Sequence, residues 1–342
     1  MNILGIESSC DETSVAIISG DKLTSNLISS QDFHKNYGGV VPELSSRAHL
    51  QIVKPLVNDA LEKSKLKLQE IDLIAATAGP GLIGALLVGL TFAKGLALSL
   101  KKPFISINHI EGHIFSGFLM KNKPEFPFLA LVVSGGHTLL LYVKSFNDIF
   151  QLGTTVDDAA GEAFDKVSKM LGFGYPGGPQ IQAAAKMGEE NKIPFPIADL
   201  DDPYNFSFSG LKTAVLRYLQ KNHKSSDDIP TGILNDVAAS FQKAVVSALL
   251  QNCARALDRF EVKSISLVGG VAANEYLREK LGVLAEKHNK KFVVPCLEFC
   301  GDNAAMIAFR AKNLYENGVR DSLSAKPYPS LKKNHFKSHH NI

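Results

Sequence analysis

Residues 3–18, ILGIESSCDETSVAII, form an apolar run, a small polar turn and a second apolar run, which predicts two strands joined by a tight connection. Residues 128–143, FLALVVSGGHTLLLYV, repeat this plan about 125 residues later. A plain hairpin turn would explain either segment alone. Both turns are rich in small residues that leave backbone N–H groups unshielded, and such turns can cradle an oxyanion such as phosphate. The repeat predicts two similar lobes.

Two further segments place glycines between a buried strand and a helix. They are residues 71–81, IDLIAATAGPG, and residues 264–274, SISLVGGVAAN, which precedes a helical stretch over 275–288. Backbone donors at such a helix N-terminus favour a phosphate or a nucleotide edge. Strands alternating with helices predict mixed sheets covered on both faces. We therefore expect an α/β protein with a ligand cleft between two lobes, over residues 1–127 and 128–325.

Size and charge set broad limits. The 342 residues, 45% of them hydrophobic, suffice for two domains, and a formal net charge of +3 permits nucleic acid without requiring it. Residues 326–342 contain four lysines, three histidines and no acid. We expect this third region to be a basic, flexible tail that is solvated, with a nucleic-acid-binding arm as the alternative.

Cysteine usage and hydropathy predict a cytoplasmic protein without a membrane span. The four cysteines form no Cys-x-x-Cys pair, and the first residues do not read as a signal peptide. Residues 81–100 are mostly apolar, but Lys94 within them would cost about 2.5–3.5 kcal/mol near a bilayer centre. We interpret this stretch as a buried helix.

His109 and His113 are four residues apart, so on a helix both imidazoles leave the same face and can bind one metal ion. A pair of hydrogen-bonded histidines under a loop is the alternative. Glu111 lies roughly 200° around the helix from His109, which disfavours a metalloprotease, whose glutamate stands beside the metal-bound water.

Asp302 has two interpretations. It precedes a probable helix in FCGDNAA, residues 299–305, where an aspartate commonly serves as the N-cap. It could instead complete the site of His109 and His113 as an oxygen ligand from the second lobe. Two imidazoles and one carboxylate leave open positions, as expected of a catalytic metal.

Asp165 could face the cleft and accept hydrogen bonds from a ribose.

Taken together, these segments resemble the TsaD family, also called Gcp or YgjD, over roughly residues 1–325. The matching motifs are GIESSCDET at 5–13, GGVVPEL at 38–44, TAGPGL at 77–82, HIEGH at 109–113, VSGGHT at 133–138, DDAAGEAFDK at 157–166, FSFSGLKT at 206–213, GGVAAN at 269–274 and CGDN at 300–303. The resemblance implies two actin/sugar-kinase/Hsp70-like (ASKHA) lobes. It also implies transfer of threonylcarbamoyl from L-threonylcarbamoyladenylate to N6 of adenosine 37, in tRNAs reading codons that begin with A. AMP leaves, and t6A forms.

The same resemblance implies site residues and partners. His109, His113 and Asp302 correspond to ligands of one divalent metal ion, with iron the usual assignment and zinc a substitute. The expected contacts to the adenylate are Val132, Val133, Ser134, Gly135, Gly136, Asp165, Gly178 and Asn274. Relatives of the bacterial type work with a TsaB-like protein and a TsaE-like ATPase.

The acyl donor is already activated, so no nucleophilic side chain is needed. Our hypothesis for the proton acceptor of the attacking amine is Asp11 or Glu12, in the first turn. Two other functions are alternatives: an ATP-dependent phosphotransferase of the acetate/sugar-kinase type, which would use the same loops, and a non-catalytic tRNA-binding scaffold.

Overall fold

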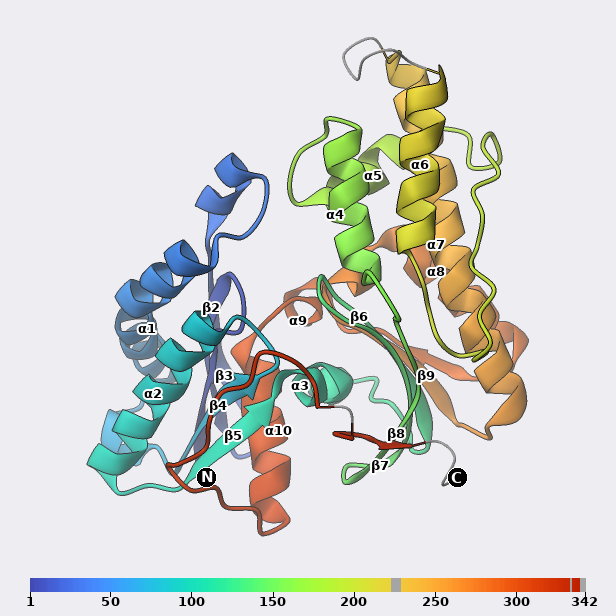
Figure 1. The fold of residues 1–342 in the computed structure, drawn as a ribbon. Coiled ribbons are helices and arrows are strands. Elements are labelled where there is room, and N and C mark those ends of the chain that lie inside the picture. Colours follow the sequence, from blue (N-terminus) through green and yellow to red (C-terminus); the bar gives the residue numbers. More distant parts are fainter. Residues whose placement is uncertain (223–228, 333, 339–342) are drawn as a thin grey trace. The chain divides into compact units, whose positions relative to one another are not determined.

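The computed structural model describes residues 1–222, 229–332 and 334–338, and the chain divides into two units. The first unit contains residues 1–121 and 295–335. The second contains residues 122–294 and the end of the chain from Phe336. Each unit is built on one mixed sheet accompanied by helices (Figure 1).

The first unit has a five-stranded sheet in the order β3-β2-β1-β4-β5. β1 pairs antiparallel with β2, β2 pairs antiparallel with β3, and β1, β4 and β5 run parallel. Its elements are β1 (Asn2–Glu7), β2 (Glu12–Ser19), β3 (Lys22–Ser30), η1 (Asp32–Tyr37), α1 (Pro42–Ser64), η2 (Leu68–Glu70), β4 (Leu73–Gly79), α2 (Ile83–Leu100), β5 (Phe104–Asn108), α3 (His109–Phe115), η3 (Ser116–Leu119), α9 (Leu297–Cys300) and α10 (Ala304–Glu316).

Helices cover both faces of this sheet. Leu4 and Ile6 of β1 belong to a buried cluster with residues of α1 and α2. Ile3, whose side chain points to the other face, packs with α10. Gly5 also faces α10, and a Cβ added there would lie 2.7 Å from the carbonyl oxygen of Ala304. The glycine therefore permits the close approach of α10 to β1.

This packing corrects the expected division of the chain. A single boundary between residues 127 and 128 assigned α10 to the C-terminal lobe, but residues 295–335 return to the first unit. The physical reason is that the apolar face of β1 around Ile3 would be exposed without α10.

The second unit repeats the sheet plan, as the sequence predicts. Its six strands have the order β10-β9-β6-β7-β8-β11, with β6, β7 and β8 antiparallel and β9 parallel to β6. Its elements are β6 (Phe128–Val133), β7 (Thr138–Ser145), β8 (Asp148–Thr154), α4 (Ala160–Met170), α5 (Gly177–Ala185), α6 (Ser209–Asn222), α7 (Thr231–Arg259), β9 (Ser264–Val268), η5 (Gly270–Ala273), α8 (Glu275–Lys287), β10 (Lys291–Val293) and β11 (Lys337–Ser338). β6 and β9 are buried throughout, which is typical of a sheet covered on both faces.

The C-terminal residues are not the flexible tail that their composition predicts. The Tyr328 backbone N–H donates to the carbonyl oxygen of Ala78 at 2.9 Å. Phe336 is buried, and β11 pairs in parallel with β8. Apolar and backbone contacts thus fix residues whose charge alone suggested a solvated arm. Residues 333 and 339–342, to which the same expectation applied, lie outside the described residues.

Two helices, α2 and α7, are long and apolar enough to cross a membrane by length and composition alone. One face of α2 is buried in the core of the first unit, where Leu90, Ala93 and Ala97 pack. Its other face exposes Ile83, Leu87 and Leu98. The helix expected to be buried is therefore buried on one side.

Candidate functional site

Helix α3 presents the two histidines. It follows β5 directly, and the side chain of Asn108 caps it by accepting a hydrogen bond from the Glu111 N–H at 3.1 Å. His109 and His113 lie on one face, as their spacing predicts, with ring centroids 4.6 Å apart and planes at 86°. Both side chains are buried.

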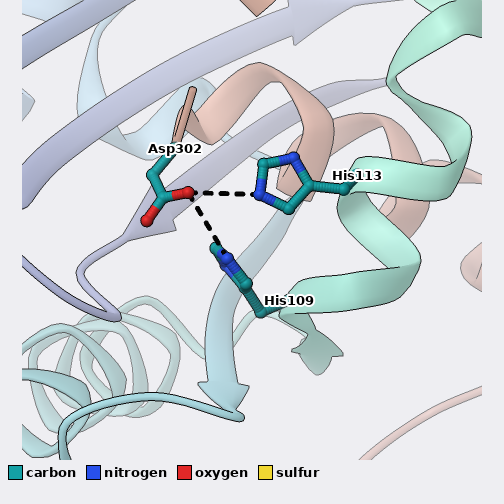
Figure 2. A group of neighbouring side chains, drawn as sticks. All are labelled: His109, His113 and Asp302. Carbon is teal, nitrogen blue, oxygen red and sulfur yellow. Dashed lines mark hydrogen bonds and ion pairs between the residues drawn. The ribbon is translucent and has the colours of Figure 1, made fainter. Parts of the chain in front are cut away.

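Asp302 completes the group, and it is not a helix cap. The side chain of the next residue, Asn303, caps α10 by accepting from the Met306 N–H at 3.0 Å, which leaves the Asp302 carboxylate available. Its Oδ1 lies 3.1 Å from Nε2 of His113 and 3.4 Å from Nε2 of His109 (Figure 2). Asp302 belongs to the first unit together with α3, so the expectation of a ligand from a second lobe is wrong.

These three residues fit a divalent metal ion. One ligand atom from each lies within 4.8 Å of the others, and both histidines are buried. Two imidazole nitrogens and one carboxylate oxygen are a donor set that suits iron(II) or zinc. Nδ1 of His113 is buried without a hydrogen-bond partner among the described residues, so this ring is held by packing and by Asp302.

The charges around His109 are strongly coupled. Burial opposes charge on this ring, but the carboxylates of Asp302 and Glu7 hold the pKa of His109 well above its ordinary value. Burial likewise opposes ionisation of Asp302, yet the neighbouring His109 and His113 hold the pKa of this carboxyl well below its usual range. Burial lowers the pKa of His113. In the metal-free protein these shifts favour the charged form of His109 over that of His113, and a metal ion binding at His109 would displace the additional proton.

Asp11 and Glu12 lie in the same unit, at the turn between β1 and β2 and at the first residue of β2. Both are partly buried. Burial and the carboxylates of Asp302 and Asp11 raise the pKa of Glu12 to about 9. Glu12 therefore stays protonated at neutral pH in the metal-free protein, and a hydrogen bond links it to Asp11.

Glu111 lies away from the histidine face. Its carboxylate accepts hydrogen bonds from Nε of Arg310 at 2.7 Å and Nη2 at 2.6 Å, and it lies 2.8 Å from Nε2 of His335. These partners occupy both carboxylate oxygens, so Glu111 does not serve as the glutamate of a metalloprotease.

In the second unit, the residues expected to contact the adenylate lie around the end of β6. Ser134 follows this strand, and its Oγ accepts from the His137 N–H at 3.1 Å. A Cβ added at Gly135 or Gly136 would meet nothing within 4 Å, so the turn is open. A Cβ at Gly161 would lie 2.5 Å from the Ser134 carbonyl oxygen, which places the start of α4 directly against the turn.

The remaining expected contacts lie on elements around this turn. The Asp165 carboxylate accepts from the Gly177 N–H at 2.7 Å, which brings the start of α5, including Gly178, beside α4. Asn274 caps α8 through its Oδ1, and its side-chain amide donates to Gln242 at 2.8 Å. Val132 and Val133 are fully buried strand residues that pair within the sheet, so the structure does not present either of them to a ligand.

Several residues that build the site escaped prediction. Glu7 ends a buried strand, and an acid in such a run was the one signal that could have revealed it. Arg310, His335 and Tyr328, which support α3 from behind, carried no local signal, since their partners are more than 190 residues away in sequence.

Residues 22–309 match the family model TsaD, tRNA N6-adenosine threonylcarbamoyltransferase. Proteins of that name from Thermosipho africanus and Symbiobacterium thermophilum are 53% and 48% identical. They align over 97% and 96% of this chain and over 100% and 96% of their own lengths.

Solved structures show the fold alone. HypF of T. kodakarensis has a TM-score of 0.61 at 16% identity, over 93% of this chain and 48% of its own. The activator of the 2-hydroxyisocaproyl-CoA dehydratase from Clostridium difficile has a TM-score of 0.51 at 14% identity, over 94% and 99%. These likenesses agree with the expected α/β fold of two units built on mixed sheets. By sequence the chain belongs to the TsaD family, tRNA N6-adenosine threonylcarbamoyltransferase, and is an enzyme of the acyltransferase class.

Proposed function

We propose that this enzyme transfers the threonylcarbamoyl group from L-threonylcarbamoyladenylate to N6 of adenosine 37 in tRNAs reading codons that begin with A. The observation that carries the proposal is the convergence of His109, His113 and Asp302 in a chain of this family. The new bond joins N6 to the carbamoyl carbon, the bond from that carbon to the phosphate oxygen breaks, and AMP leaves with the electron pair.

His109, His113 and Asp302 would hold one divalent ion, iron by the family's usual assignment, with zinc as a substitute. When bound, the ion would supply Lewis-acid and template chemistry for the activated acyl donor. The buried donor set and the compact spacing of its atoms support this assignment.

The second unit would bind the adenylate. We assign the backbone N–H groups of Gly135 and Gly136 to the phosphate, because the turn is open and glycine leaves its backbone accessible. The Ser134 N–H donates to the His137 carbonyl oxygen at 2.8 Å, so Ser134 would contact the ligand through its hydroxyl group. Asp165, Gly178 and Asn274 would complete the contacts that orient the nucleotide, and the buried residues Val132 and Val133 would hold the strand that carries the turn.

The attacking amine must lose a proton as the new bond forms. We assign its acceptor to Asp11 or Glu12. The electrostatic coupling of Glu12 to Asp302 supports the assignment, because a cation held by Asp302 would favour the ionised form of Glu12, which keeps its proton in the metal-free protein. If both Asp11→Asn and Glu12→Gln keep normal single-turnover transfer, this role is excluded.

The proposed partners are tRNA, the adenylate, a TsaB-like protein and a TsaE-like ATPase, in the cytoplasm. The test combines the purified chain, pre-formed threonylcarbamoyladenylate, a tRNA transcript and the two partner proteins, with nucleoside analysis by mass spectrometry. We expect modified adenosine from the wild type, none from His109→Ala, and none from a transcript carrying guanosine at position 37. A metal-replete wild type that yields no modified adenosine would contradict the proposal.

A further inference from the structure

Glu7 is a fully buried carboxylate whose oxygens are all engaged. It is the last residue of β1 and has 0% exposed surface. Its Oε1 accepts a hydrogen bond from the Ser9 N–H at 2.6 Å, and its Oε2 accepts one from Oγ1 of Thr77 at 2.5 Å. The same Oε2 lies 3.1 Å from Nδ1 of His109.

A carboxylate at this position is costly, so it calls for a reason. The preceding residues of β1 from Ile3 to Ile6 are buried and apolar, and an ionised group among them costs several kcal/mol unless it is paired and hydrogen-bonded. The neutral donors Ser9 and Thr77 satisfy hydrogen bonds but offer no charge. His109 is the partner that can supply it.

The contact with Glu7 decides how His109 binds a metal. An ionised carboxylate only accepts hydrogen bonds, so Nδ1 of His109 must carry a proton to donate to Oε2. The lone pair for a metal is then on Nε2, the nitrogen 3.4 Å from Oδ1 of Asp302. Carboxylates placed behind metal-binding histidines fix the tautomer and raise the basicity of the ligand nitrogen.

His113 has no such support. Its Nδ1 is buried without a hydrogen-bond partner among the described residues. A metal on Nε2 of His113 would leave a proton on Nδ1 facing no acceptor there. The two imidazoles are thus unequal in their surroundings, and His109 is the one whose tautomer and orientation are fixed.

We propose that Glu7 is a positioning residue for the metal centre: through Nδ1 of His109 it sets the tautomer and direction of that ligand, and the affinity for a divalent cation depends on this contact. The inference rests on the metal centre proposed above. It adds to that centre a residue that does not touch the ion.

The test is direct metal binding by purified, chelator-stripped protein, with Co²⁺ and Zn²⁺ as the probes. Loss of such a supporting group typically weakens metal affinity by roughly 10–100-fold, and we expect this from Glu7→Gln. Glu7→Asp keeps the charge but withdraws the oxygens from Nδ1, so it should lose a comparable factor. It also carries the test if Glu7→Gln does not fold. Either folded variant binding within about twofold of the wild type would overturn the proposal.

Glu111→Gln is the matched control. It makes the same change at an acid on the histidine helix whose carboxylate is paired with Arg310 and His335, away from the ligands. We expect lower stability but unchanged metal affinity. An equal loss of affinity in this control would show that general loosening of α3, and not the contact with His109, is responsible, which would also overturn the proposal.

A nuclear magnetic resonance readout separates positioning from a merely structural role. In the Zn²⁺-loaded, ¹⁵N-histidine-labelled wild type, we expect a protected Nδ1–H proton from His109, assigned by its loss in His109→Ala. This signal should vanish in Glu7→Asp, whose oxygens are withdrawn from Nδ1, while the backbone spectrum is retained, and its persistence there would refute the contact. If the wild type binds neither metal, or if His109→Ala binds as tightly, the metal centre itself fails, which is a different result.

Discussion

Arg310 and Glu111 form a buried ion pair behind the metal-binding face of α3, and breaking it should loosen that helix. Nε and Nη2 of Arg310 lie 2.7 and 2.6 Å from Oε2 of Glu111, and the guanidinium stacks over Phe115 at 4.7 Å. Arg310→Met keeps most of this packing and removes only the charge and the donors. The carboxylate of Glu111 would be left with His335 as its partner.

The expected cost is about 3 kcal/mol, because breaking a buried ion pair costs 3–5 kcal/mol and His335 still serves one oxygen. The double variant Arg310→Met, Glu111→Gln should lose no more than Arg310→Met alone, since no unpaired charge remains in it. The double variant should therefore be roughly 2 kcal/mol more stable than the summed losses of the two single variants would give.

Native-state hydrogen exchange followed by mass spectrometry measures the loss of stability around α3 locally. A local measurement is needed because a protein of two units need not unfold in one step. Exchange in peptides of α3 and α10 should accelerate roughly a hundred-fold, since each 1.4 kcal/mol corresponds to a factor of ten. Peptides of β6 in the second unit serve as the internal control and should be unchanged. A loss under about 1 kcal/mol, or strictly additive variants, would refute the reasoning.

Four further predictions concern protons, the ligand turn and the chain end. The pKa of Glu12 is raised to about 9 from 4.5, so the contribution of its protonated form to folding stability is complete below pH 4.5 and is lost as the pH rises towards 9. In urea titrations across this range, metal-free Glu12→Gln should therefore gain stability relative to the wild type. Because the pKa of His109 is raised, Zn²⁺ uptake at pH 7 should release about one proton, measured by calorimetry in buffers of different ionisation enthalpy; no buffer dependence would contradict it. Gly161→Ala should weaken adenylate binding at least tenfold, since its Cβ would lie 2.5 Å from the Ser134 carbonyl oxygen, and unchanged affinity by calorimetry would count against the cradle. Deleting residues 326–342 should lower stability and reduce tRNA affinity only modestly, whereas complete loss of binding in a filter assay would show that this segment is a main tRNA contact.

The sequence predicts much of this protein because its strongest signals are local. Alternating apolar runs and glycine turns specify strands and their connections within a few residues, so the repeat of residues 3–18 at 128–143 and the two mixed sheets follow from the chain alone. The pairing of His109 and His113 on one helix face likewise depends only on the helical repeat. In these cases the local structure depends only on residues that are neighbours along the chain.

Tertiary structure decided the contacts between distant segments. By sequence Asp302 could cap α10, but Asn303 caps this helix in the structure, and this leaves the carboxylate of Asp302 for the histidines. Glu7 gains its role only when Thr77 and His109 are brought to it from other strands and helices. The second face of β1 needed a covering helix, and α10, about 300 residues later, filled it beside Gly5. Burial of apolar surface selects such partners by shape and area, and these quantities exist only once the chain has folded.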